Sequence, residues 1–119
     1  MVPSKDEKLN IEIVDLESGV RQLKLSGPLT LRTLFDFQEV SRRDPGKPVV
    51  VDVEQVPYMD SAGLGATIGL FSSCQRTKRG FGIIGIQDRI RTLFQVTGMD
   101  GILPTYPNLE AAEAAIRAE

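Results

Sequence analysis

The chain has 119 residues, a net charge of −2 at pH 7 and 25% charged residues, a composition typical of one ordinary globular domain. It contains no histidine and one cysteine, which excludes the commonest general base, a Cys/His metal cluster and an intrachain disulfide. The acidic balance and the lack of a basic stripe also argue against a nucleic-acid-binding surface.

The first residues predict a loose start followed by a β-hairpin. Residues 1–8 are polar and lack the apolar stretch of a secretory signal, so we expect a flexible N-terminus before a domain over 9–119. Apolar and polar residues then alternate in LNIEIVDL at 9–16 and VRQLKLSG at 20–27. This period of two indicates strands with one solvated face, and Ser18-Gly19 supplies the turn between them.

The segment at 27–46, GPLTLRTLFDFQEVSRRDPG, predicts the first helix. Thr30 is the expected N-cap, and the stop is expected at 44–46, Asp-Pro-Gly. Phe37 lies off the apolar stripe and is expected at the surface. The stripe itself consists of Leu31, Leu34 and Phe35.

A buried strand and a second helix are predicted next. KPVVVDV at 47–53 has no polar alternation among its valines, which is typical of a central strand covered on both faces. Helical spacing then continues to about Lys78, and Gly80 is the expected residue after its end. Cys74 is expected as a small core residue on the apolar face of this helix. That face consists of Leu64, Ile68, Phe71 and Cys74.

The C-terminal part repeats the alternation of strand and helix. FGIIGI at 81–86 predicts a buried strand and QDRIRTLFQVTG at 87–98 a helix with Ile90, Leu93, Phe94 and Thr97 on one side. LPTY at 103–106 predicts a short strand, and NLEAAEAAIRAE at 108–119 a last helix. The order β-β-α-β-α-β-α-β-α predicts an α/β fold with a mixed, mostly parallel sheet, an N-terminal hairpin and about four helices packed on it. No apolar run approaches the ~20 residues that cross a bilayer.

The most unusual stretch is YMDSAGLGAT at 58–67, where an acid, a hydroxyl and two glycines join a strand to a helix. Ser61 has no histidine to activate it, and Met59 breaks the Gly-x-Ser-x-Gly pattern of an esterase nucleophile. The glycines are spaced G-x-G-x-x-x-G and do not form a dinucleotide or P-loop motif. The carboxylates of Asp52, Glu54 and Asp60 are better explained as caps and surface charge than as metal ligands.

The same stretch is well suited to begin a helix. Either Asp60 or Ser61 can cap the free N–H groups. Gly63 and Gly65 each weaken the helix by up to ~1 kcal/mol relative to alanine, so a local reason is expected for them. The reason is either close approach of another chain or a phosphate, or close packing of the helix on the sheet. A phosphoryl group on Ser61 would add about −1.5 to −2 charge at a partner surface shaped for a hydroxyl, so the site could act as a binding switch.

The residues VVVDVEQVPYMDSAGLGAT at 49–67 resemble the core motif of STAS-domain proteins, specifically the bacterial anti-sigma factor antagonists. The resemblance extends to LSGPLT at 25–30, GFGIIGI at 80–86, RIRTLFQVTGMDGIL at 89–103 and the alanine-rich final helix. It implies a mixed sheet with helices mainly on one side. It also implies a cytoplasmic, non-enzymatic regulator with no cofactor or metal of its own, which neither binds nucleic acid directly nor inserts into membranes.

The partners that the resemblance implies are an anti-sigma factor and a phosphatase. The anti-sigma factor would be a serine kinase of the histidine-kinase-like ATPase fold, and binding it would release a sigma factor. The same kinase would phosphorylate Ser61 and end the interaction, and a metal-dependent serine phosphatase would reverse the modification. The nucleotide belongs to the kinase, so this chain is a substrate and a binding partner.

The contacts with that partner are expected around Ser61. Met59 and Leu64 are expected to be partly exposed, although a core role for Leu64 is equally open. At Thr30, many members of the family carry an acidic residue, and this chain carries an uncharged hydroxyl. The full set of predicted partner contacts is Asp60, Met59, Ala62, Gly63, Leu64 and Thr30.

Two alternative functions remain open from the sequence. In the first, which the departure at Thr30 favours slightly, the chain is a STAS docking subunit of a transporter ATPase or a signalling scaffold and is not phosphorylated. In the second, it is a small enzyme or ligand-binding domain that uses the glycine-rich junction, but no base, metal cluster or cofactor loop supports that reading.

Overall fold

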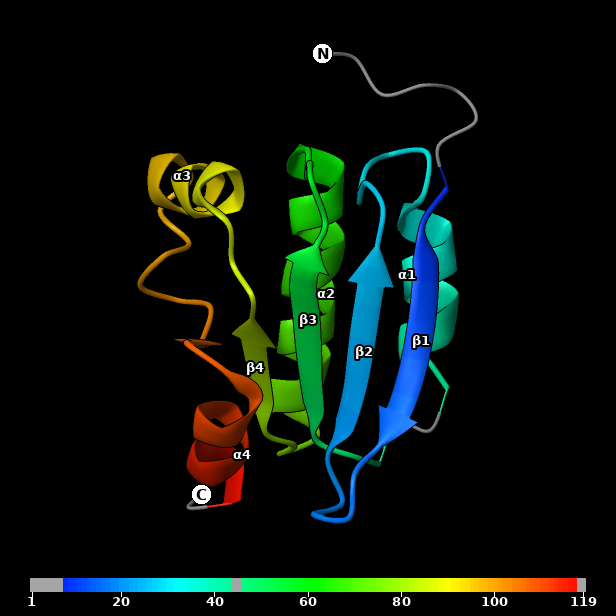
Figure 1. Cartoon of the computed structure of the whole chain (residues 1–119), viewed down its shortest axis with the longest axis vertical. Helices are drawn as coiled ribbons and strands as arrows, with labels where there is room; N and C mark the ends of the chain where they lie inside the picture. Colours follow the sequence, from blue (N-terminus) through cyan, green and yellow to red (C-terminus); the bar gives the residue numbers. More distant parts are fainter. Residues whose placement is uncertain (1–7, 44–45, 118–119) are drawn as a thin grey trace.

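The computed structural model describes residues 8–43 and 46–117 and shows one five-stranded sheet in the order β1-β2-β3-β4-β5 (Figure 1). β1 is antiparallel to β2, and every other neighbouring pair is parallel. This result confirms the predicted α/β class and the predicted order of elements. Apart from Lys8, the expected loose start at 1–8 lies outside the described residues. The elements are β1 (Asn10–Asp15), β2 (Arg21–Ser26), α1 (Leu34–Ser41), β3 (Val49–Gln55), α2 (Ser61–Arg76), β4 (Phe81–Ile84), α3 (Asp88–Val96), β5 (Thr105–Tyr106) and α4 (Leu109–Arg117).

The helices cover the two faces of the sheet unequally. α1, α2 and α3 contribute to the larger core, which receives Val49, Val51 and Val53 from alternate positions of β3. α4 packs on the opposite face, where Val50 meets Ala112 and Ile116 in a smaller cluster. β3 is therefore covered on both faces at its valines, as predicted. Within the described part of the chain, no helix is long and apolar enough to cross a membrane.

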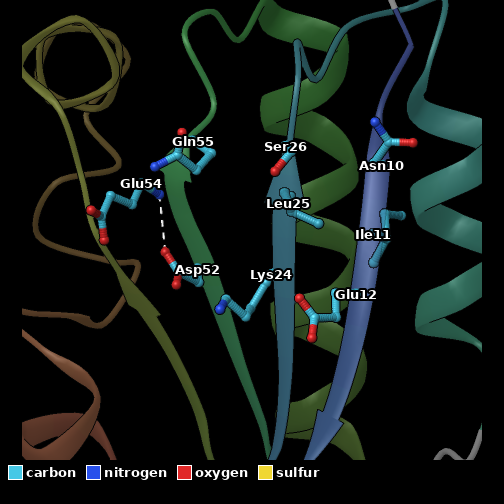
Figure 2. A pocket seen from close by; sticks show the side chains of 9 residues that line it. All are labelled: Asn10, Ile11, Glu12, Lys24, Leu25, Ser26, Asp52, Glu54 and Gln55. Atoms are coloured by element: carbon cyan, nitrogen blue, oxygen red, sulfur yellow. Dashed lines mark hydrogen bonds between the residues drawn. The ribbon is translucent and has the colours of Figure 1, made fainter.

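The part of the sheet that α4 leaves uncovered is polar. Glu12, Lys24 and Asp52 are register partners across three adjacent strands, so a cation lies between two anions along one row. Such cross-strand pairs of opposite charge stabilise a solvated face. Figure 2 shows these side chains projecting from the strands around a shallow hollow of about 530 Å³. Among the residues described, no group of three or more His, Cys, Asp or Glu side chains could hold a metal ion.

A β-bulge interrupts the pairing of β2 and β3 near the end of β3, shortly before the chain enters α2. The register between β2 and β3 shifts between Lys24 and Ser26, and the Glu54 amide donates to Asp52 Oδ1 at 3.0 Å. Gly85 crosses the bulge with φ of +75°, and a Cβ on it would lie 2.8 Å from the Glu54 nitrogen. The bulge is therefore held by the Asp52 side chain within β3 and by the close packing of Gly85, which follows β4, against Glu54.

The first helix differs from its prediction. α1 begins at Leu34 because residues 31–33 form a turn first. Phe37, expected at the surface, is fully buried, whereas Leu31 and Phe35, expected in the core, are 66% and 71% exposed. Leu34 has helical spacing both with the predicted partners Leu31 and Phe35 and with Phe37. The packing of α1 buries Leu34 together with Phe37. The predicted stop at 44–46 falls partly outside the described residues.

The later helices agree better with their predicted faces. In α2, Leu64 and Cys74 are buried and Ile68 and Phe71 are partly buried; burial raises the pKa of the Cys74 thiol, as expected for a core residue. In α3 the predicted face is correct except at Thr97, which is exposed and follows the end of the helix.

An ion-pair cluster around Asp15 at the hairpin makes part of the free energy of unfolding dependent on pH in the acid range. Asp15 accepts from Arg21 Nε at 2.8 Å and lies 3.3 Å from Lys47 Nζ. The Arg21 hydrogen bond, with Lys47 adding to it, lowers the pKa of Asp15 from 3.8 to about 2. Because the folded pKa is the lower one, this stabilisation is present above about pH 4 and is lost as the pH falls towards 2.

We expect Asp15→Asn to remove that dependence. Urea unfolding at several pH values should show a free-energy difference between wild type and variant at about pH 6 that disappears near pH 2. Asp100→Asn is the control, because Asp100 is exposed and forms no ion pair with another described residue. A difference that stays constant down to pH 2 would contradict the assignment.

Candidate functional site

The loop after β2 and the segment after β3 are joined by their backbones. Gly27 N donates to Gln55 O at 3.0 Å, Leu29 N to Tyr58 O at 3.0 Å, and Asp60 N to Leu29 O at 3.3 Å. These bonds, with a parallel bridge between Leu29 and Met59, continue the parallel pairing of β2 and β3 beyond the bulge. Both bridge side chains are buried, so the backbone that leads into α2 is anchored in the core.

Asp60 is the N-cap of α2, and its carboxylate joins two segments. Oδ1 accepts from Gly63 N at 2.8 Å, which is the usual N-cap bond. Oδ2 accepts from Leu31 N at 3.1 Å and so ties the loop before α1 to the start of α2. Of the two predicted caps, Asp60 is therefore the one used, and Ser61 becomes the first residue of the helix.

Ser61 is exposed, and its hydroxyl forms no hydrogen bond with another described residue. Because Asp60 already caps the helix, the Ser61 side chain is not needed as the N-cap. Position 61 therefore presents a hydroxyl to solvent at the positive end of a 16-residue helix.

The two glycines of the junction have different explanations. A Cβ on Gly63 would lie 2.1 Å from the Leu29 carbonyl oxygen, which no side chain can tolerate. The chain that approaches Gly63 is therefore this protein's own loop, and close packing is the reason for that glycine. A Cβ on Gly65 would meet nothing within 4 Å, so Gly65 leaves bare helix backbone on the exposed face next to Ser61.

Thr30 is buried and its side chain is used within its own turn. Its Oγ1 accepts from Arg32 N at 3.2 Å, and its backbone N–H donates to Thr33 Oγ1 at 2.9 Å. Thr30 thus caps the turn at 31–33 and not α1 itself, which corrects the predicted N-cap. With 6% of its surface exposed, it shapes the loop that carries Leu31.

Met59, a predicted partner contact expected at the surface, is buried, and of the two roles left open for Leu64 the core role is confirmed. Met59 and Leu64 are each 5% exposed, because the start of α2 turns both side chains towards the sheet. Gly63 is also buried. At the surface, the predicted contacts leave Asp60 and Ala62, both partly exposed, beside Ser61.

Two surface residues near Ser61 were missed from the sequence. Leu31 and Phe35 are largely exposed, and the Leu31 amide bonded to Asp60 places Leu31 beside the start of α2, with Phe35 four residues further along the chain. We call Leu31 and Phe35 the apolar patch. The signal for it was an excess of large apolar residues, since one face of a short helix cannot bury Leu31, Leu34, Phe35 and Phe37 together. Two large exposed apolar side chains thus accompany the unbonded Ser61 hydroxyl at this end of the molecule.

Comparison with known proteins agrees with this arrangement. The family model for the STAS domain matches residues 13–112. A relative named anti-sigma-B factor antagonist from Staphylococcus aureus (strain NCTC 8325 / PS 47) is 33% identical over 98 residues, covering 80% of this chain and 90% of that protein. The fold and the sequence together define a STAS-domain protein, and the chain belongs to the family of STAS-domain anti-sigma factor antagonists.

Solved structures show the same fold. An anti-sigma factor antagonist from Mycobacterium paratuberculosis superimposes with a TM-score of 0.79 at 24% identity, covering 92% of this chain and 94% of the other. A putative anti-sigma factor antagonist from Thermotoga maritima gives a TM-score of 0.76 at 16% identity, covering 90% and 94%. At these identities the likeness concerns the fold alone.

The two glycines predict opposite effects of the same substitution. Gly63→Ala should lower the free energy of unfolding by about 2 kcal/mol or more, because the new methyl group collides with the Leu29 carbonyl. Gly65→Ala should raise it by about 0.5–1 kcal/mol, because alanine favours the helix and has open space. Urea unfolding measures both. Equal effects of the two substitutions would show that the close contact at Gly63 does not govern the start of α2.

Proposed function

We propose that this protein binds an anti-sigma factor through the surface around Ser61, and that phosphorylation of Ser61 by that partner ends the binding. The observation that carries the proposal is the exposed, unbonded Ser61 hydroxyl at the start of α2, beside the apolar patch. The names of the relatives support the class of partner. Release of the sigma factor follows if the two proteins compete for the same anti-sigma factor.

The physical basis of the switch is that the fold can accept the negative charge of a phosphoryl group at Ser61, whereas the bound partner cannot. A phosphoryl group adds about −1.5 to −2 charge, and the free N–H groups at the start of α2 favour it there. The partner would have to bury that charge next to the Asp60 carboxylate and the apolar patch. An unpaired buried charge costs about 4 kcal/mol, which weakens a complex roughly a thousandfold.

The chemistry of the modification belongs to the partner. Ser61 has no basic side chain bonded to it among the described residues, so a base of the kinase takes its proton while Oγ attacks the γ-phosphorus of the nucleotide and the nucleoside diphosphate leaves. The proposed kinase has the histidine-kinase-like ATPase fold and supplies the nucleotide, and a metal-dependent serine phosphatase restores the hydroxyl. This protein then acts as a substrate and a binding partner, without enzymatic activity.

Substitution of Ser61 tests the switch. Ser61→Ala should abolish phosphate transfer from the cognate kinase, because the acceptor oxygen is lost. Ser61→Asp should bind the anti-sigma factor at least about tenfold more weakly than wild type by calorimetry. Ala114→Asp is the control, because it places the same charge at an exposed position of α4, on the opposite face of the sheet. Full labelling of Ser61→Ala, or wild-type affinity of Ser61→Asp, would refute the proposal.

The apolar patch supplies a separate prediction. Leu31→Ala and Phe35→Ala should each weaken anti-sigma factor binding at least about tenfold, because burying a leucine or phenylalanine side chain fully is worth about 1.5–3 kcal/mol. Both are exposed, so the free energy of unfolding should change little. Val96→Ala, at an equally exposed apolar position on α3, is the control and should bind normally. If the patch binds a protein but Ser61 is never labelled, the docking-module alternative replaces the phosphorylation switch.

A further inference from the structure

A groove of about 340 Å³ lies between α1 and α2, away from the sheet's polar face and from the Ser61 hydroxyl. Its lining extends from Ala66 to Arg76 along α2, and includes Arg42 next to the end of α1 and Arg79 after α2. Ten residues of α-helix rise about 15 Å, so the groove is longer than a single carboxylate or phosphate ion.

The groove carries a strong positive charge in a protein whose net charge is −2. Three guanidinium groups, those of Arg42, Arg76 and Arg79, line it, and no carboxylate from the described residues does. Both helices end at this side of the groove, and each helix C-terminus contributes about −0.5 charge. The two ends together offset about one of the three positive charges, which leaves an excess of about two.

The arginines differ in how they are held. Arg79 is fixed by bonds to Lys47 O at 3.1 Å, to Thr77 Oγ1 at 2.7 Å and to Ser73 Oγ at 3.3 Å. Arg42 and Arg76 are exposed, and their side chains form no hydrogen bond or ion pair with another described residue. The guanidinium groups of Arg42 and Arg76 are therefore available to a ligand, beside that of Arg79, which hydrogen bonds hold in place.

The floor of the groove continues the face that begins at Ser61. Ser61, Gly65 and Gly69 are spaced by four residues, so they lie in one row along α2, and Gly69 lines the groove. A Cβ on either glycine would meet nothing within 4 Å, so a chain can lie close to this helix. From Ser61 to Arg76 the helix rises about 22 Å, which one partner domain can cover.

We propose that this groove docks an acidic segment of the protein partner, with carboxylates paired to Arg42 and Arg76. The identity of that partner rests on the proposed function. Arginine binds carboxylates in a two-pronged geometry, and the small-residue floor admits a peptide backbone. A nucleic acid is disfavoured because no aromatic side chain of the described residues lines the groove and the chain as a whole is acidic.

A peptide probe tests the groove without the partner. We expect a hexaglutamate peptide, titrated into the ¹⁵N-labelled protein at low salt, to shift the amide signals of Gly69, Ser73 and Arg76, whereas hexalysine leaves them unchanged. The double variant Arg42→Gln/Arg76→Gln should lose these shifts. Arg89→Gln/Arg91→Gln, which removes two exposed arginines of α3, is the control and should keep them. Unchanged shifts in the groove variant, equal shifts with inorganic phosphate, or tighter binding of a single-stranded oligonucleotide would overturn the proposal.

The same variants separate this proposal from the phosphorylation switch. Arg42→Gln/Arg76→Gln should slow association with the anti-sigma factor at least about fivefold at low salt and should reduce the salt dependence of that rate. Unchanged association, while Ser61 of the wild type is phosphorylated normally, would overturn the groove and leave the switch intact. Loss of the peptide shifts in the groove variant, in a protein that no kinase labels at Ser61, would support the groove and refute the switch.

Discussion

The contact between Gly63 and the Leu29 carbonyl is the constraint on which the site depends. Helix α2 can begin where it does only because its third residue has no side chain, which lets the helix rest on the loop that follows β2. The Asp60 carboxylate then joins the two segments by accepting one hydrogen bond from each. Both features fix the backbone of the helix start without using the Ser61 side chain.

The residues at 59–64 have separate roles. Asp60 and Gly63 hold the structure, Met59 and Leu64 fill the core, and Ser61 presents an exposed hydroxyl. Because hydrogen bonds hold the backbone on either side of Ser61, the fold sets the place from which its hydroxyl projects, which would reduce the entropy lost if a partner binds there. In the proposed function, a charge added at that position acts on the partner, because the Ser61 side chain forms no bond that holds the fold.

The exposed face of α2 links two surfaces of different chemistry. Near its start lie the apolar patch and the Ser61 hydroxyl, and near its end lies the groove lined by arginines. In the proposed function, apolar contact would supply affinity that a phosphate on Ser61 removes, whereas charge in the groove would accelerate the encounter with the partner. Gly65 and Gly69 leave the helix backbone open between these surfaces, so one partner could contact both.

The sequence by itself determined the α/β class, the order of all nine elements and the junction that carries Ser61, because hydrophobic periodicity and turn residues are local signals. It did not determine which apolar residues around α1 are buried, because more than one set of them has helical spacing. The sequence therefore placed Phe37 outside and Phe35 inside, and the packing reverses both. Only the tertiary structure decided those positions, the reason for Gly63 and the convergence of the arginines. Each of these depends on which distant segments pack together, and no local pattern contains that information.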